Sequence, residues 1–132
     1  MKRRRARSLG RRGQRAAFYV GGLVATGAGL HTMLAGARSL PGKPQANPSV
    51  ESELRYYAGF YFAFGLAVLR VAPRADRDPA AVRAVAGVLF LAGLARAGAW
   101  LAVGKPHVGQ RILLAIELGA PPIMVASQKR LG

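Results

Sequence analysis

The chain has 132 residues, of which 52% are hydrophobic, and it carries a formal net charge of +15 at pH 7. This combination is unusual for a water-soluble domain and is typical of a membrane protein whose basic residues lie in its ends and loops. The sequence contains no cysteine, which excludes disulfides, thiolate metal sites and cysteine nucleophiles.

Residues 1–15, MKRRRARSLGRRGQR, are predicted to form a basic cytoplasmic tail. They include eight basic residues and no acidic or aromatic residue. Clustered arginines bind either anionic lipid headgroups or nucleic acid. Because this segment joins an apolar segment directly and has no aromatic ring to stack on a base, we expect anionic lipid headgroups as its partner and no nucleic acid.

Four apolar segments follow the tail and predict a membrane domain over residues 16–128. A helix needs about 20 residues to cross the hydrocarbon core, and these segments lack the polar face of a soluble surface helix. The uncharged stretches within them are often short, so a soluble helical bundle is the alternative. The predicted fold class is all-α, an antiparallel bundle of four transmembrane helices. Its spans are expected at about 16–38, 54–72, 81–104 and 111–128.

The distribution of basic residues predicts the orientation of these spans. An N-in/C-in arrangement places 14 basic residues on the cytoplasmic side and five outside. This bias fits a multi-pass protein of the cell inner membrane with both ends in the cytoplasm. The alternative is a cleaved secretory signal ending near AGA at residues 35–37, which would leave three spans.

The segment NPSVESELRYY at residues 47–57 predicts the start of the second span. Glu51 lies in the first turn and can pair with Arg55, four residues later on the same helix face. Tyr57 suits the aromatic belt at the membrane interface. One interpretation is a capped and anchored helix start. The other makes Glu53, Arg55 and Tyr57 the mouth of a pocket.

An arginine in the middle of the third span needs a partner. Arg96 lies ten positions before Pro106, at the predicted loop, and Glu117 lies 11 positions after it. In an antiparallel hairpin, both side chains therefore lie at nearly the same depth. An isolated charge in lipid costs at least about 2.5–3.5 kcal/mol on insertion scales, so we expect Arg96 and Glu117 to form an ion pair.

The other two spans contribute polar side chains at a similar depth. His31 lies near the outer end of the first span, and Tyr61 lies about two turns into the second. Together with Arg96 and Glu117 they are predicted to form a buried polar cluster in the outer half of the membrane. This cluster either ties the helices together or binds a ligand, and both interpretations remain open at this point.

No pattern in the sequence predicts a reaction. There is no HExxH motif, no cluster of carboxylates and no pairing of a nucleophile with a base. We therefore predict no catalytic residues, no metal site and no cofactor, and an enzymatic activity is disfavoured.

The segments ELRYYAGFYFAFGLA, LAGLARAGAWLAVGKPH and ELGAPP resemble the domain-of-unknown-function 4345 family of small four-helix bacterial membrane proteins. The similarity covers about residues 20–128. It implies a common four-helix fold and brings no assigned activity. The family is also similar to DoxX-type proteins, which loosely implies redox or quinone-linked partners. The matching positions are Glu53, Arg55, Tyr56, Tyr57, Arg96, Gly104, Pro106 and Glu117, of which Gly104 and Pro106 form a loop motif.

These observations lead to two functional hypotheses. The first is an accessory or assembly partner of a larger membrane complex, which would contact other membrane proteins or a second copy of itself. The second is a binder or carrier of a lipid- or quinone-type small molecule, which would use the polar cluster in the outer leaflet. A cavity at the level of Arg96 would favour the second hypothesis.

Overall fold

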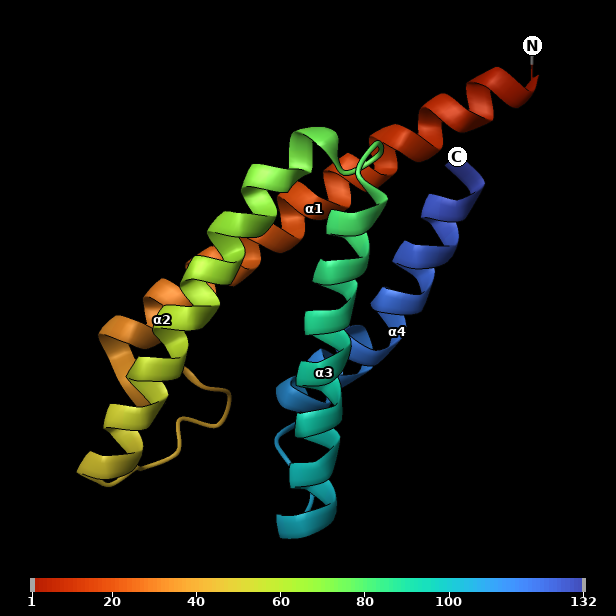
Figure 1. The fold of residues 1–132 in the computed structure, drawn as a ribbon. Helices are drawn as coiled ribbons and strands as arrows, with labels where there is room; N and C mark the ends of the chain where they lie inside the picture. Colours follow the sequence, from red (N-terminus) through yellow and green to blue (C-terminus); the bar gives the residue numbers. More distant parts are fainter. Residues whose placement is uncertain (1, 132) are drawn as a thin grey trace. The chain divides into compact units, whose positions relative to one another are not determined.

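The structure is a computed structural model that describes residues 2–131. Within this range it contains four α-helices and no strand, which confirms the all-α prediction (Figure 1). The elements are α1 (Lys2–Ala35), the 3-10 helix η1 (Gly36–Ser39), α2 (Pro48–Val71), the 3-10 helix η2 (Ala72–Arg74), α3 (Pro79–Val103) and α4 (Val108–Leu131).

Polar residues cap the beginnings of two helices. The side chain of Asn47 accepts a hydrogen bond from a backbone N–H three residues later at 2.9 Å, so α2 begins at Pro48. Asp78 accepts the equivalent bond at 3.0 Å, and α3 begins at Pro79. A proline in the first helical turn loses no hydrogen bond, because the N–H groups there have no helical partner.

Over the described residues, α1, α3 and α4 are long and apolar enough to cross a membrane, and α2 is not among these candidates. The first turns of α2 carry Glu51, Glu53 and Arg55, which lower its hydropathy. Three apolar helices of this length indicate a membrane protein. A fourth crossing by α2 stays a prediction.

Contacts divide the chain into two compact units. The first comprises the described residues up to Arg15 together with those from Arg74 onward, and the second comprises Ala16–Pro73. Residues 2–15, predicted as a tail, form the first turns of α1. The basic segment is therefore helical.

In the second unit, α1 and α2 run antiparallel and lie side by side (Figure 1). A Cβ atom added to Gly22 would lie 2.7 Å from the side chain of Leu69. A Cβ atom added to Gly29 would lie 2.5 Å from the backbone nitrogen of Phe62. The contacting residues therefore follow one another in opposite order along α1 and α2, as in an antiparallel pair. Glycine lets the two backbones approach closely.

In the first unit, α3 and α4 form an antiparallel hairpin (Figure 1). Gly93 lets them approach, since a Cβ atom added there would lie 2.7 Å from the side chain of Leu118. The α4 helix continues through Pro121 and Pro122. Both prolines lack the N–H that a helix interior uses, which weakens α4 locally.

A polar network in the first unit joins the start of α1 to α4 and to the α2–α3 loop. Gln14 donates a hydrogen bond to Gln128 at 2.7 Å. Arg15 donates two to the Asp76 carboxylate, at 2.6 and 3.2 Å. The hydrogen bond from Arg15 is the main reason why the pKa of Asp76 lies below its usual range. The ion pair therefore stabilises the folded chain at a pH above the ordinary carboxyl pKa. This stabilisation is lost as the pH falls through the lowered pKa of Asp76.

Candidate functional site

Arg96 and Glu117 form a two-point ion pair in the α3–α4 hairpin. Nε of Arg96 donates to one carboxylate oxygen of Glu117 at 2.8 Å, and a terminal guanidinium nitrogen donates to the other at 3.0 Å. The Glu117 side chain is 12% exposed and that of Arg96 is 32% exposed. Such forked, charge-assisted contacts are stronger than single neutral hydrogen bonds and fix the orientation of the guanidinium plane.

The geometry of the hairpin explains why these two residues meet. Gly93 lies one turn before Arg96 on α3, and a Cβ atom added there would lie 3.2 Å from Cβ of Glu117. The absence of a side chain at Gly93 therefore brings α4 close enough for a direct pair. The tight loop between the helices sets the two residues at matching depths.

A cavity of about 360 Å³ lies beside this pair, at the end of α3 and the beginning of α4. Arg96 forms part of its wall, so the cavity and the ion pair share one guanidinium. Lys105 and Gln110 add further polar groups, and Trp100 adds an aromatic surface. The lining consists of Arg96, Ala99, Trp100, Val103, Gly104, Lys105, Pro106 and Gln110.

The loop motif at Gly104 and Pro106 shapes one side of this cavity. Gly104 ends α3 with a φ of 105°, in the region of the backbone map that favours glycine. Its N–H donates to the carbonyl of Trp100 at 3.0 Å, which closes the last turn of α3. His107 follows, and its ring nitrogen accepts a bond from the N–H of Gly109 at 3.1 Å at the start of α4.

His31 and Tyr61 belong to the other unit of the chain. His31 is an exposed residue of α1. Tyr61, on α2, is 40% exposed, and its ring stacks on that of Phe64 with the centroids 6.5 Å apart. The predicted convergence of these two residues with Arg96 and Glu117 therefore stays a prediction. No group of three or more metal-ligating side chains occurs within residues 2–131.

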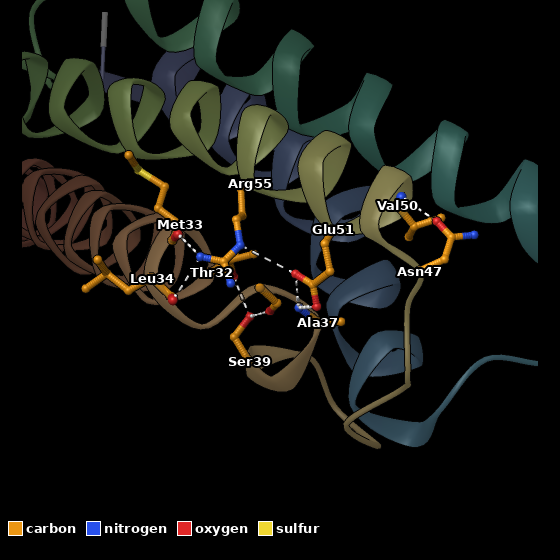
Figure 2. A network of polar contacts seen from close by, with 10 residues as sticks. Thr32, Met33, Leu34, Ala37, Ser39, Asn47, Val50, Glu51 and Arg55 are labelled. Carbon is orange, nitrogen blue, oxygen red and sulfur yellow. Dashed lines mark hydrogen bonds and ion pairs between the residues drawn. The ribbon is translucent and has the colours of Figure 1, made fainter.

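A second polar network joins the end of α1 to the beginning of α2, and Figure 2 shows it from close by. Arg55 donates to the backbone carbonyls of Met33 and Leu34, both at 3.0 Å. Glu51 accepts from the N–H of Ala37 at 3.2 Å and pairs with Arg55 at 3.5 Å. Arg55 thus caps carbonyl groups that have no partner within α1.

One of the three residues predicted at a pocket mouth, Arg55, belongs to this network. Arg55 binds the end of α1, a contact that neither interpretation of this segment included. Tyr57 is 63% exposed, and its ring meets that of Tyr56 edge to face with the centroids 5.4 Å apart. Glu53 is exposed and has no hydrogen bond or ion pair within the described part of the chain. A ligand-binding role for these residues stays a prediction.

Sequence reasoning missed the cap that Arg55 provides and the hydrogen bond between Gln14 and Gln128. The first could have been sought from Gly36, which follows α1 with a φ of 59° and marks the end of a helix. The second joins residues 114 positions apart, and no local pattern indicates such a contact.

A family model described as "Domain of unknown function (DUF4345)" matches residues 13–128. The match includes the Arg96–Glu117 pair, the cavity beside it and the Arg55 network. Comparisons with curated proteins and with solved structures gave no match.

Proposed function

This chain belongs to the family described as Domain of unknown function (DUF4345), and we propose that it binds a lipid- or quinone-type small molecule in the cavity beside Arg96. The observation that carries the proposal is the cavity itself, because Arg96 of the ion pair forms part of its wall. The family description assigns no activity.

The chemistry of the cavity selects a ligand with acceptor oxygens on a polar head. Arg96, Lys105 and Gln110 all carry N–H donors, and the first two are cationic. A cavity of about 360 Å³ lies within the range of roughly 300–1,000 Å³ that small-molecule sites occupy. It accommodates a quinone ring or a lipid headgroup, and Trp100 and Val103 provide apolar contacts for the attached chain.

The ion pair prepares the cavity for such a ligand. Glu117 holds the guanidinium of Arg96 at two points, so its orientation is fixed before a ligand binds. Binding then costs less side-chain entropy. The low polarity around the hairpin strengthens hydrogen bonds to the ligand. The proposed activity is binding or carriage and includes no chemical step.

The location of the site follows from a proposed topology. We place the chain in the cell inner membrane with four crossings and both ends in the cytoplasm, as the distribution of basic residues favours. The cavity then lies at the outer end of the α3–α4 hairpin. A membrane-impermeant maleimide should label a Lys105→Cys variant from outside intact cells, and labelling only after the cells are broken would reverse this placement.

The role of an accessory or assembly partner is the competing proposal. No contact or surface among the described residues specifically favours it. It also predicts a different outcome on purification, because membrane proteins rather than a small molecule would accompany the chain. The similarity to DoxX-type proteins loosely implies redox partners, and such proteins would also copurify with the chain.

Trp100 is the only tryptophan in the chain and lines the cavity, so its fluorescence reports binding there. We expect decyl-benzoquinone or a lysophospholipid to change this fluorescence saturably in detergent-solubilised protein. Ala99→Phe should fill the cavity and weaken binding at least about tenfold, because it removes the space for the polar head. The natural ligand should copurify with the protein and be identified by mass spectrometry of an organic extract.

Ala102→Phe is the matched control, because Ala102 is an exposed residue of the same helix and does not line the cavity. It should leave the fluorescence titration unchanged. If Ala99→Phe and Ala102→Phe titrate alike, or no probe changes the fluorescence while proteins copurify stoichiometrically, the accessory role replaces this proposal.

A further inference from the structure

A second cavity lies in the first unit, between the basic start of α1 and the end of α4. Its volume is about 550 Å³. Its wall combines the guanidinium-bearing residues Arg7 and Arg130 with an apolar floor. The lining residues are Ala6, Arg7, Gly10, Ile123, Ala126, Ser127, Arg130 and Leu131. We call this cavity the basic groove.

The basic groove is held open by the polar network at its inner end. Gln14 bonds both to Gln128 at 2.7 Å and to Ser127 at 3.1 Å, and these contacts fix α1 against α4. The Gln14 and Gln128 residues are 7% and 8% exposed, so water competes little for their hydrogen bonds. At the other end of the groove, α1 and α4 approach closely at Gly10, where an added Cβ atom would lie 3.0 Å from the side chain of Leu131.

The charges of the basic groove are not neutralised within the described chain. Neither Arg7 nor Arg130 has an ion-pair partner among the side chains of residues 4–131. The surrounding sequence adds more positive charge, since residues 1–15 hold eight basic residues and no acidic one. A ligand for this groove must therefore be anionic.

We propose that the basic groove binds one anionic phospholipid of the bilayer. The phosphate lies between Arg7 and Arg130, and an acyl chain follows the apolar surface of Ile123, which is 69% exposed. Arginine binds phosphate oxygens through its fork of N–H groups. Basic pockets beside membrane-spanning helices are known sites for acidic headgroups.

The composition of the groove favours a lipid over nucleic acid. It contains no aromatic side chain on which a base could stack, and its floor is alkyl. A phospholipid matches both parts of this surface at once, because its phosphate and acyl chain are joined in one molecule. The inference concerns a site other than the cavity at Arg96 and does not depend on it.

The test is to reconstitute the full chain in vesicles of phosphatidylglycerol and phosphatidylcholine, extract it in a mild neutral detergent and count retained lipids by native mass spectrometry. The unsubstituted protein should retain phosphatidylglycerol. Arg7→Ala/Arg130→Ala should reduce that retention at least about tenfold, because it removes both charge-assisted contacts with the phosphate.

Arg5→Ala/Arg12→Ala is the matched control. It removes the same charge from α1 at two exposed positions that do not line the basic groove. Retention should fall less than about threefold, because these arginines attract the bilayer only diffusely. Ala126→Trp, which fills the groove without changing the charge, should abolish retention, whereas Ala115→Trp on another part of α4 should not.

Three results would overturn the inference. An equal loss of retained phosphatidylglycerol in the two double variants would mean that the basic segment attracts lipid diffusely and that the groove is not a specific site. Equal retention of phosphatidylcholine would remove the role of charge. Binding of RNA through Arg7 and Arg130, without retained lipid, would assign the groove to nucleic acid. Trp100 fluorescence titrations of the same variants should stay unchanged, which separates this site from the proposed function.

Discussion

Replacement of Arg96 by alanine is expected to lower the stability and membrane abundance of this protein severely. The substitution leaves the Glu117 carboxylate, which is 12% exposed, without its two-point partner. Removal of one member of a buried ion pair typically costs about 3–5 kcal/mol, because the remaining charge has no compensation. The amount of protein in isolated membranes and its thermal stability in detergent measure this effect.

A double variant tests whether Arg96→Ala destabilises the protein by leaving the Glu117 carboxylate without its partner. Arg96→Ala/Glu117→Ala should recover part of the lost stability, since it removes the uncompensated carboxylate as well. Arg83→Ala is the control, because Arg83 is an exposed arginine of the same helix without an ion-pair partner among the described residues. Additive losses in the double variant would contradict a stabilising Arg96–Glu117 pair.

Gly65→Leu is expected to separate α1 from α2 and destabilise the second unit. Gly65 is buried, and a Cβ atom at this position would overlap the backbone nitrogen and the hydroxyl oxygen of Thr26. Backbone atoms cannot move aside as a flexible side chain can, and overpacking typically costs about 1–3 kcal/mol or more. Thermal unfolding of the purified variant in detergent measures the loss.

Gly59→Leu is the matched control for this substitution. Gly59 lies on the same helix, and an added Cβ atom there would have no neighbouring atom within 4 Å. This variant should therefore unfold within a few degrees of the unsubstituted protein. Equal destabilisation by the two substitutions would mean that the contact with Thr26 does not govern the effect, since the change from glycine to leucine by itself favours a helix.

The sequence predicts the elements well where local signals dominate. Proline and asparagine or aspartate mark the beginnings of α2 and α3, and glycine at position 104 marks the end of α3. The meeting of Arg96 and Glu117 was also predictable, because a short loop fixes the register of an antiparallel hairpin. Counting residues on each side of the loop then gives the depth of both side chains.

Contacts between distant segments could not be predicted in the same way. Gln14 and Arg15, at the end of the basic segment, bind Gln128 and Asp76, which lie far along the chain, and the charge of residues 1–15 does not indicate these contacts. Arg55 binds two carbonyl groups of α1, a contact that neither interpretation of residues 47–57 included. These roles depend on the packing of helices, which hydropathy and spacing do not encode.

Cysteine reactivity tests most directly whether hydrocarbon surrounds the α3–α4 hairpin. The chain has no native cysteine, and Leu91 on α3 is 67% exposed in the isolated chain. In intact membranes a Leu91→Cys thiol should fail to react with N-ethylmaleimide, because the reactive thiolate does not form in lipid. The Lys105→Cys thiol in the loop should react readily. If Leu91→Cys reacts as fast as Lys105→Cys, water surrounds this helix and the account of a membrane-embedded ion pair is wrong.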